Sequence, residues 1–414
     1  MFEVFLPVAA ATERLRSSLL GSHLDEYCSW LVELGYQTRT VRNKLYVLAE
    51  FAHWMAKQHL DLADLDEESV DEYLKFRRHR TRRQNGARLT VLQLLGRLRS
   101  AGVIPVPAPT RDCSALGALL GRYETYLCEE RALGQETRTD YLKTARQFAI
   151  DCLGARAARF NRLRHSHVRE FLLACIRRVG PKRAQSIRSG LRSFLRFLFL
   201  RSEIQTDLAL AVPTIRRWQL SSVPRYVAVS DVERVLRACD LSSAIGRRDR
   251  AILLLLARLG LRGCEIRELE LDDLRWREGE IVVRGKGSIR DRLPLLSDVG
   301  EALALYLERD RPRCNSRRVF IRWRAPYRGY ARPCTVSAIV ARALARAGLA
   351  PPVRGAHLFR HSLATAMVRR GASLDEIGQV LRHRSPSTTE IYAKLDFDAL
   401  RDVAMPWPTA RGVR

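Results

Sequence analysis

Several side chains in the C-terminal half of the chain could together act on a phosphodiester. Tyr392 lies nine residues after His383, and further upstream lie His357, Arg360 and Arg262. A phenolic hydroxyl within reach of two guanidinium groups and two imidazoles can attack phosphorus. A tyrosine nucleophile then keeps the energy of the broken bond in a covalent phosphotyrosine. These residue types therefore predict cleavage followed by rejoining, and not hydrolysis.

The spacing of these residues suggests how they could share the chemistry. Glu265 follows Arg262 by three residues, and Arg360 follows His357 by three, so each pair can lie on one face of a helix. Two arginines can clamp both non-bridging oxygens of a phosphoryl-transfer transition state, while a carboxylate holds a neighbouring group in place. Lys286, flanked by two glycines, could protonate the departing oxygen. Either imidazole could accept the tyrosine proton or bind the phosphate. We therefore predict that the reaction needs no metal and no other cofactor.

Single members of this set have other interpretations. His357 and His361, four residues apart, could bind zinc, but neither an HExxH glutamate nor a nearby cysteine completes such a site, so we predict no metal. Tyr392 alone would more often be a half-buried helix aromatic. We expect His361 to be structural and to pack against the helix that follows. The order and spacing of the whole set carry the prediction.

The charge of the chain predicts a polyanionic partner. Its 414 residues have a formal net charge of +27 and a pI near 10.6, and only seven of the 72 basic residues are lysines. Arginine suits phosphate contacts because its planar guanidinium donates several hydrogen bonds. Codon bias and solvated helix faces explain part of the excess but not so large a net charge, so nucleic acid is the predicted partner.

The remaining composition predicts a cytoplasmic, nucleoid-associated protein. Nine cysteines are scattered without a CxxC pair, which is typical of reduced thiols. The N-terminus has no signal-peptide pattern. The strongest apolar run, residues 251–256, is far too short to span a bilayer, so we predict no membrane partner.

The first half of the chain contains a repeat with a period near 98 residues. The pattern Leu-Gly-x-x-Thr-Arg-Thr occurs at 34–40 and 133–139, and Val-x-Glu-(Tyr/Phe)-Leu occurs at 70–74 and 168–172. Apolar residues recur at helical spacing in both copies, which predicts two related helical domains. These residues are Val41, Leu45, Leu48, Ala52 and Met55, and Ile187, Leu191, Phe194, Leu195 and Leu198. The expected order is a helical domain at 1–104, a linker at 105–113, a second helical domain at 114–212 and a linker at 213–229.

Arginines of both helical domains could contact DNA. Arg188, Arg192 and Arg196 recur every four residues, opposite the apolar face of their helix, and we predict that this stripe faces DNA. A denser cluster that includes Arg82 and Arg83 in the first copy carries the same prediction. A merely solvated helix face is the alternative for both.

The C-terminal half has a different pattern, which predicts a fold that is mainly α with a small β-hairpin or sheet. We expect a helix from Ser230, with Glu233 in capping-box position, to about Gly260. Strands at 280–284 and 291–295 would flank Lys286 at a hairpin turn. Helices are expected at 336–347 and 358–370. Capping boxes starting at Ser373 and Ser387 place Tyr392 within a short helix.

The residues Arg262, Glu265, Lys286, His357, Arg360, His383 and Tyr392 resemble the complete catalytic set of the tyrosine recombinases, the phage-integrase-like site-specific recombinases. The resemblance covers about residues 225–400 and implies an α+β catalytic domain at 230–396, followed by a tail at 397–414. Residues 114–212 look like the helical SAM-like core-binding domain of that family. The copy at 1–104 is an addition that implies accessory DNA binding. Arg382 is a departure, because the family commonly has glycine before this histidine.

The resemblance implies site-specific DNA recombination through a 3′-phosphotyrosyl intermediate, without metal or ATP. It implies that Arg262 and Arg360 activate the phosphate, that Lys286 is the general acid and that Tyr392 is the nucleophile. His357 would be a general acid/base, His383 would support the phosphate and Glu265 would orient its neighbours.

The implied partners are double-stranded DNA, a homo- or hetero-tetramer on paired DNA sites, and other recombinases. The additional domain favours an integrase or transposase of a mobile element over a chromosome-dimer resolvase. Residues 395–403 can form a helix that docks on its own domain or on a neighbouring protomer. Two alternatives are a type IB topoisomerase that relaxes supercoils and an accessory DNA-binding protein without catalysis. The spacing from His383 to Tyr392 and the repeat favour recombination over relaxation, and the intact set argues against loss of catalysis.

Overall fold

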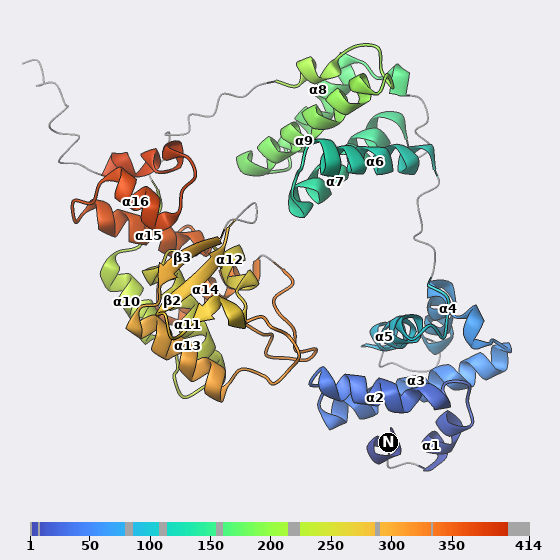
Figure 1. Ribbon diagram of the computed structural model, residues 1–414. Coiled ribbons are helices and arrows are strands. Elements are labelled where there is room, and N and C mark those ends of the chain that lie inside the picture. Colours follow the sequence, from blue (N-terminus) through green and yellow to red (C-terminus); the bar gives the residue numbers. More distant parts are fainter. Residues whose placement is uncertain are drawn as a thin grey trace, which may run out of the picture. The chain divides into compact units, whose positions relative to one another are not determined.

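A computed structural model describes residues 2–6, 9–78, 86–106, 114–154, 160–213, 224–285, 290–332 and 334–395 (Figure 1). The fold is mainly helical with one small antiparallel sheet, as predicted. Contacts between Cα atoms divide the chain into two compact units, Pro105–Arg217 and the combination of Met1–Ile104 with Trp218–Arg414. Within the described ranges, no helix is both long enough and apolar enough to cross a membrane.

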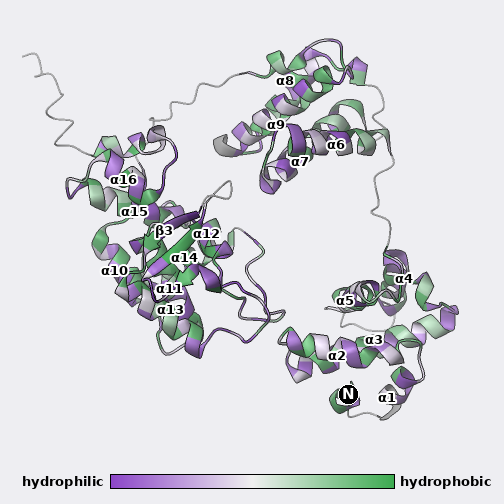
Figure 2. Cartoon of the chain, viewed as in Figure 1, coloured by the Kyte–Doolittle hydropathy of each residue, from purple (hydrophilic) through white to green (hydrophobic). Residues whose placement is uncertain are grey.

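The N-terminal part is helical and has its own apolar core. Its helices are α1 (Ala9–Arg16), α2 (Leu24–Glu33), α3 (Thr38–Gln58), α4 (Glu67–Arg78) and α5 (Ala87–Ser100), with 3₁₀ turns at Phe2–Phe5, Gly21–His23 and Leu62–Asp64. The predicted apolar face of α3, from Val41 to Met55, is buried in this core. Hydrophobic and hydrophilic residues occur together on the same helices, so each helix can turn an apolar side inward (Figure 2).

Pro105–Arg217 is a second helical body. It contains α6 (Ala115–Thr125), a π-helical turn (Tyr126–Glu130), α7 (Gln135–Leu153), α8 (His165–Ile176) and α9 (Pro181–Leu200), with 3₁₀ turns at Phe160–Arg162 and Leu208–Ala211. The predicted apolar face of α9, from Ile187 to Leu198, lies in its core.

The two copies of the sequence repeat occupy corresponding helices. The first pattern leads into α3 in one copy and into α7 in the other, and the second pattern lies in α4 and in α8. Val70 and Tyr73 of α4 are buried, as are Val168 and Phe171 of α8. Equivalent positions of the two copies are therefore buried in the cores.

The C-terminal part combines helices with a three-stranded sheet. It contains α10 (Val229–Arg237), α11 (Ala244–Arg258), α12 (Gly263–Glu268), β1 (Leu274–Arg275), β2 (Glu280–Arg284), β3 (Arg290–Pro294), α13 (Ser297–Arg309), α14 (Cys334–Arg346), α15 (His357–Val368) and α16 (Leu374–Leu381), with 3₁₀ helices at Leu271–Asp273, Pro386–Thr388 and Glu390–Leu395. Helix α11 contacts α13, α14 and α15. Its residues 251–256 are buried, so this apolar run forms the centre of the core.

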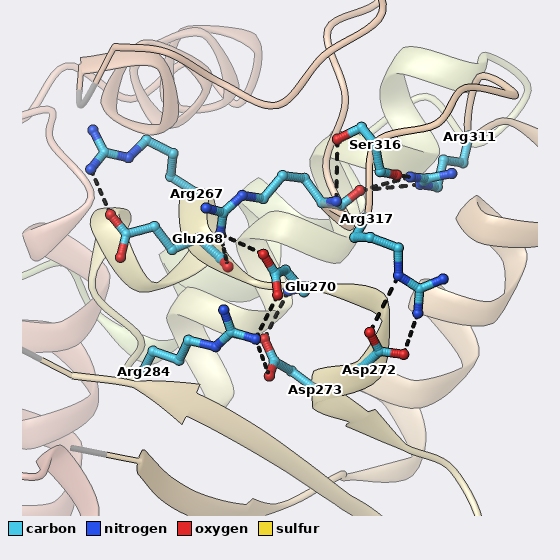
Figure 3. A network of polar contacts seen from close by, with 10 residues as sticks. Arg267, Glu268, Glu270, Asp272, Asp273, Arg284, Arg311, Ser316 and Arg317 are labelled. Atoms are coloured by element: carbon cyan, nitrogen blue, oxygen red, sulfur yellow. Dashed lines mark hydrogen bonds and ion pairs between the residues drawn. The ribbon is translucent and has the colours of Figure 1, made fainter. Parts of the chain in front are cut away.

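The sheet has the order β1-β2-β3, and both pairings are antiparallel. The predicted hairpin is confirmed, with Val283 of β2 opposite Asp291 of β3. Lys286 at its turn lies outside the described residues. Arg284 at the end of β2 donates to Glu270 and to Asp273, at 2.6 and 3.0 Å (Figure 3). These ion pairs connect β2 to the turn that follows α12.

Two local predictions in this part are wrong. The single helix expected from Ser230 to Gly260 is two helices, because the chain turns after α10 and Ser243 then caps α11 by accepting from the amide of Gly246 at 3.1 Å. Helix α10 begins at Val229, and Ser230 is not its cap. The capping box expected at Ser387 is also absent, since its hydroxyl hydrogen bonds to Ser385. Tyr392 nevertheless lies in a short helix, of the 3₁₀ type.

Candidate active site

Tyr392 is buried in a small apolar cluster near the end of the described chain. Its exposed fraction is 1%. The cluster joins α15, α16 and the 3₁₀ helix Glu390–Leu395, and its other buried members are Ala364, Val368, Ile377, Leu381 and Leu395. Two helices and a 3₁₀ turn thus fix the position of the phenol.

Two imidazoles flank the phenol ring. Nδ1 of His361 lies 2.7 Å from the hydroxyl of Tyr392, within a hydrogen bond. The ring of His383 is parallel to the ring of Tyr392, with 6.4 Å between centroids and an interplanar angle of 2°. His383 is held by a hydrogen bond of 2.8 Å between its Nδ1 and Oγ1 of Thr389.

Burial sets the protonation of all three rings. It raises the pKa of Tyr392 to about 12, and the nearby charge of Arg360 opposes that rise. Burial also lowers the pKa of His361 to about 4, with help from His357 and Arg360, and that of His383 to about 4, with help from nearby arginines. At neutral pH the phenol is therefore protonated and both imidazoles are neutral. A neutral imidazole beside a phenol can accept its proton.

Arg360 lies on α15 with an exposed fraction of 3%. Its guanidinium donates to the carbonyl oxygens of Gly260 and Leu381. Burial, and then the positive charges of Arg262 and Arg382, lower the pKa of Arg360 to about 10. The guanidinium groups of these arginines are thus close enough to repel one another.

Arg262 is the residue before α12 and is held by Glu265. Its Nη1 donates to Oε1 of Glu265 at 2.6 Å, and its backbone amide donates to Oε2 at 2.8 Å. Burial raises the pKa of Glu265, but the amide of Arg262 and the charges of Arg382 and Arg262 outweigh it, so that the pKa lies below its ordinary value. Glu265 is therefore an ionised, buried clamp for Arg262.

The site has an excess of positive charge. Three guanidinium groups, those of Arg262, Arg360 and Arg382, act on one another here. Two carboxylates oppose them: Glu265 pairs with Arg262 and Arg382, and Asp291 lies 3.8 Å from Arg382. A bound anion would relieve the repulsion that lowers the pKa of Arg360. A phosphate suits this place, since planar guanidinium groups bind its oxygens in pairs.

Most of the predicted catalytic residues lie around this centre. Arg262, Glu265, Arg360, His383 and Tyr392 are brought together by the contacts above. The exposed His357 lies at the start of α15, one turn before His361, with 6.4 Å between the two rings.

Sequence reasoning missed two features of the centre. His361, predicted to support the site by packing against a helix, contacts the phenol hydroxyl itself. Arg382, noted as a departure from the family, binds Glu265. The zinc alternative gains no support in the described ranges, where no three His, Cys, Asp or Glu side chains are grouped to hold a metal. The four-residue spacing from His357 to His361 marks one helix face and could have pointed to the centre.

The predicted arginine stripe of α9 is only partly exposed. Arg188 has an exposed fraction of 7% and donates to the carbonyl of Pro213 at 3.4 Å, so the prediction of an exposed stripe is wrong at this residue. Arg192 is half-buried and donates to the carbonyl of Val212 at 2.8 Å. Arg196 is exposed and remains a predicted DNA contact. Arg82 and Arg83 lie outside the described residues.

Two family models match the chain. The phage integrase family matches residues 225–398, and the phage integrase N-terminal SAM-like domain matches residues 120–202. A protein of Sinorhizobium fredii with the provisional name integrase/recombinase y4rA is 43% identical over 93% of this chain and 94% of its own length. Tyrosine recombinase XerD of Listeria innocua is 31% identical over 56% of this chain and 78% of its own length.

Solved structures share the fold at lower identity. The XerH site-specific recombinase, in a post-cleavage complex with its palindromic difH substrate, matches with a TM-score of 0.53 and 18% identity over 72% of this chain and 96% of that one. A lambda integrase tetramer bound to a Holliday junction matches with a TM-score of 0.52 and 18% identity, over 80% of this chain and 91% of that one.

Proposed function

The chain belongs to the phage integrase family of tyrosine recombinases, and from this premise we propose that it cuts and rejoins duplex DNA at specific sites through a 3′-phosphotyrosyl bond to Tyr392. The observation that carries the proposal is the arrangement of Arg262 and Arg360. The two guanidinium groups donate to consecutive carbonyl oxygens at the end of α16, those of Leu381 and Arg382, and the charge of Arg360 acts on the phenol. A phosphate bound between them would relieve their repulsion.

Each residue of the centre takes one part of the proposed reaction. Arg262 and Arg360 bind the non-bridging oxygens and stabilise the charge of the transition state. Glu265 orients Arg262 through its two hydrogen bonds. His383 supports the phosphate, and His361 holds the hydroxyl of the nucleophile before attack.

The bonds and protons of the proposed step balance. The oxygen of Tyr392 bonds to phosphorus while the bond from phosphorus to the 5′ oxygen breaks. The phenol proton passes to Nδ1 of His361, which lies 2.7 Å from the hydroxyl, and the 5′ oxygen takes a proton from Lys286. Rejoining reverses both transfers. His357, exposed one turn before His361, remains a further predicted general acid/base. A substrate with a better 5′ leaving group should rescue a Lys286→Ala variant, and a failure of rescue would assign the proton donor elsewhere.

We assign the domains as predicted from the sequence. Residues 114–212 and 230–396 bind duplex DNA as core-binding and catalytic domains, residues 1–104 bind accessory DNA, and 397–414 is a tail. Double-stranded DNA is the substrate, and a tetramer on two paired sites is the working assembly, alone or with other recombinases. Solved tetramer and DNA complexes of the same fold support this assignment.

We further propose that the protein is the integrase or transposase of a mobile element and works on DNA in the nucleoid. The similarity to y4rA includes the N-terminal domain, because it spans 93% of this chain, whereas the similarity to XerD spans 56%. Sequencing the DNA that copurifies with the protein from its host tests this. Paired repeats at the ends of one element support the proposal, and a single chromosomal site contradicts it.

A nicked suicide substrate tests the central proposal. Loss of the short strand beyond the nick prevents rejoining, so the covalent complex accumulates and is visible on a denaturing gel. The wild-type protein should form this complex, and Tyr392→Phe should bind the same DNA without forming it. A persistent adduct in Tyr392→Phe would contradict the assignment of the nucleophile.

A further inference from the structure

Arg382 occupies a backbone conformation that usually belongs to glycine. It follows α16 with a φ of 54°, in the left-handed region. Any side chain here costs free energy relative to glycine. The side chain of Arg382 is nevertheless almost completely buried, with 7% of its surface exposed. A buried arginine at a position suited to glycine points to a specific use of its guanidinium.

The contacts of Arg382 reach both members of the Arg262–Glu265 pair. Its Nη2 donates to Oε2 of Glu265 at 2.9 Å. Its own carbonyl oxygen accepts from Nη2 of Arg262 at 3.3 Å. Nη1 donates to the carbonyl oxygens of Leu259 and Val380, both at 3.3 Å, which fixes the guanidinium plane.

The remaining nitrogen of Arg382 faces the sheet. Nε lies 3.8 Å from Oδ2 of Asp291 on β3, within an ion pair. Nε is buried and has no hydrogen-bond partner among the described residues, so Asp291 is the charge it faces. Arg382 therefore links Glu265, the residue that holds Arg262, to β3, the third strand of the sheet.

We propose that Arg382 is a positioning residue, which fixes Glu265 and Arg262 in their reactive geometry and couples them to β3. The proposal rests on the proposed function in one respect, namely that Arg262 binds the reacting phosphate. Arg382 acts through Glu265 and not by contact with substrate.

Removal of Arg382 should leave the fold intact. Glu265 would keep both hydrogen bonds from Arg262, so no buried carboxylate would lose all of its partners. Glycine would also relieve the backbone cost at φ 54°. What disappears is the second anchor of the carboxylate, so that Glu265 and Arg262 can shift together. Displacements of about 1 Å in a catalytic group cost on the order of 100-fold in rate.

Single-turnover cleavage of a suicide substrate at saturating protein tests the proposal. Arg382→Gly should lower the cleavage rate constant by roughly 100-fold while the dissociation constant for DNA stays unchanged. Arg382→Lys should recover part of the rate, because an ammonium can reach Glu265 but cannot also satisfy the carbonyl oxygens and Asp291. Arg384→Gly is the matched control, since this exposed arginine two residues later loses the same charge. It should cleave like the wild type.

Asp291→Asn tests the link to the sheet. Combined with Arg382→Gly it should add no further loss of rate, because Asp291 would act only through Arg382. Additive losses, a wild-type rate in Arg382→Gly, or an equal loss in Arg384→Gly would each overturn the proposal.

A measurement without DNA separates this inference from the proposed function. Hydrogen exchange of the amides in β2 and β3 should become faster in Arg382→Gly and stay unchanged in Arg384→Gly. Unchanged exchange in Arg382→Gly would refute the coupling to β3 even if the enzyme is active. A wild-type protein that forms no adduct would instead refute the proposed function, and the exchange result would still decide the coupling.

Discussion

The ring of His361 lies against the hydroxyl of Tyr392, with 2.7 Å between Nδ1 and the phenol oxygen. Both side chains are poor acids or bases for their type, because burial raises the pKa of the phenol to about 12 and lowers that of the imidazole to about 4. The hydrogen bond therefore joins two neutral groups at neutral pH, and the proposed nucleophile is held in its protonated form.

The stability of the fold should depend on this pair as a unit. His361→Phe leaves a buried hydroxyl without its partner, and we expect a loss of about 1–3 kcal/mol in the free energy of unfolding. The double variant with Tyr392→Phe removes both polar groups and should lose less than the two single changes added together. Urea denaturation followed by circular dichroism measures all three variants. Strictly additive losses would show that the hydrogen bond does not couple the two residues.

Acid should lower the free energy of unfolding through the two buried histidines beside Tyr392. His361 and His383 have pKa values near 4 in the folded chain, below their ordinary value of 6.5. The unfolded chain therefore binds more protons than the folded chain between about pH 6.5 and 4, and stability falls as the pH drops through this window. Above about pH 6.5 both histidines are neutral in the folded and in the unfolded chain, so they no longer make the free energy of unfolding depend on pH. His383→Gln should flatten the dependence of the unfolding free energy on pH in that window, and an unchanged slope would contradict the shift.

The sequence was most informative where the chemistry of a position is local. The pairs Arg262–Glu265 and His357–Arg360 and the hairpin of β2 and β3 follow from residue types and short spacings. The grouping of both pairs around Tyr392 was indicated by the family resemblance. The capping box at Ser373 formed as predicted, with its hydroxyl accepting from the amide of Glu376 at 3.2 Å. The same pattern at Ser387 failed, because Pro386 begins a separate 3₁₀ turn there.

Contacts between distant segments that the family resemblance does not imply could not be predicted from the sequence. Arg382 and Glu265 are 117 residues apart, and no spacing rule connects them. The buried Arg188 likewise donates to the carbonyl of Pro213, a residue 25 positions later and beyond the end of α9. The four-residue spacing of these arginines shows that they share a helix face, but not which of them a later segment covers.

The two ends of the arginine stripe should therefore behave differently. Arg196→Ala removes an exposed charge and should reduce by about one the slope of the logarithm of DNA affinity against the logarithm of salt concentration. Arg188→Ala removes a buried guanidinium and should lower the free energy of unfolding instead. Fluorescence anisotropy over a salt series, with urea denaturation, distinguishes the two. An unchanged salt slope in Arg196→Ala would remove this residue from the DNA interface.

A comparison of two glycines with similar backbone conformation tests whether the carbonyl oxygens that bind Arg360 hold it in place. Gly260 and Gly279 have φ values of 59° and 63°, so alanine is strained at both by about 1–2 kcal/mol. An added Cβ at Gly279 would meet nothing within 4 Å among the described residues, whereas at Gly260 it would lie 2.8 Å from Cδ2 of the buried Leu381. We expect this crowding to cost a further ~1–3 kcal/mol in Gly260→Ala.

Only Gly260→Ala should also slow cleavage. The carbonyl oxygens of Gly260 and Leu381 both accept from the guanidinium of Arg360, so a displacement of either residue moves the proposed phosphate ligand. Gly279→Ala should lose stability to the smaller extent and cleave at the wild-type rate. Equal cleavage rates in the two variants, measured at saturating protein on a suicide substrate, would show that these carbonyl oxygens do not position Arg360 for the reaction.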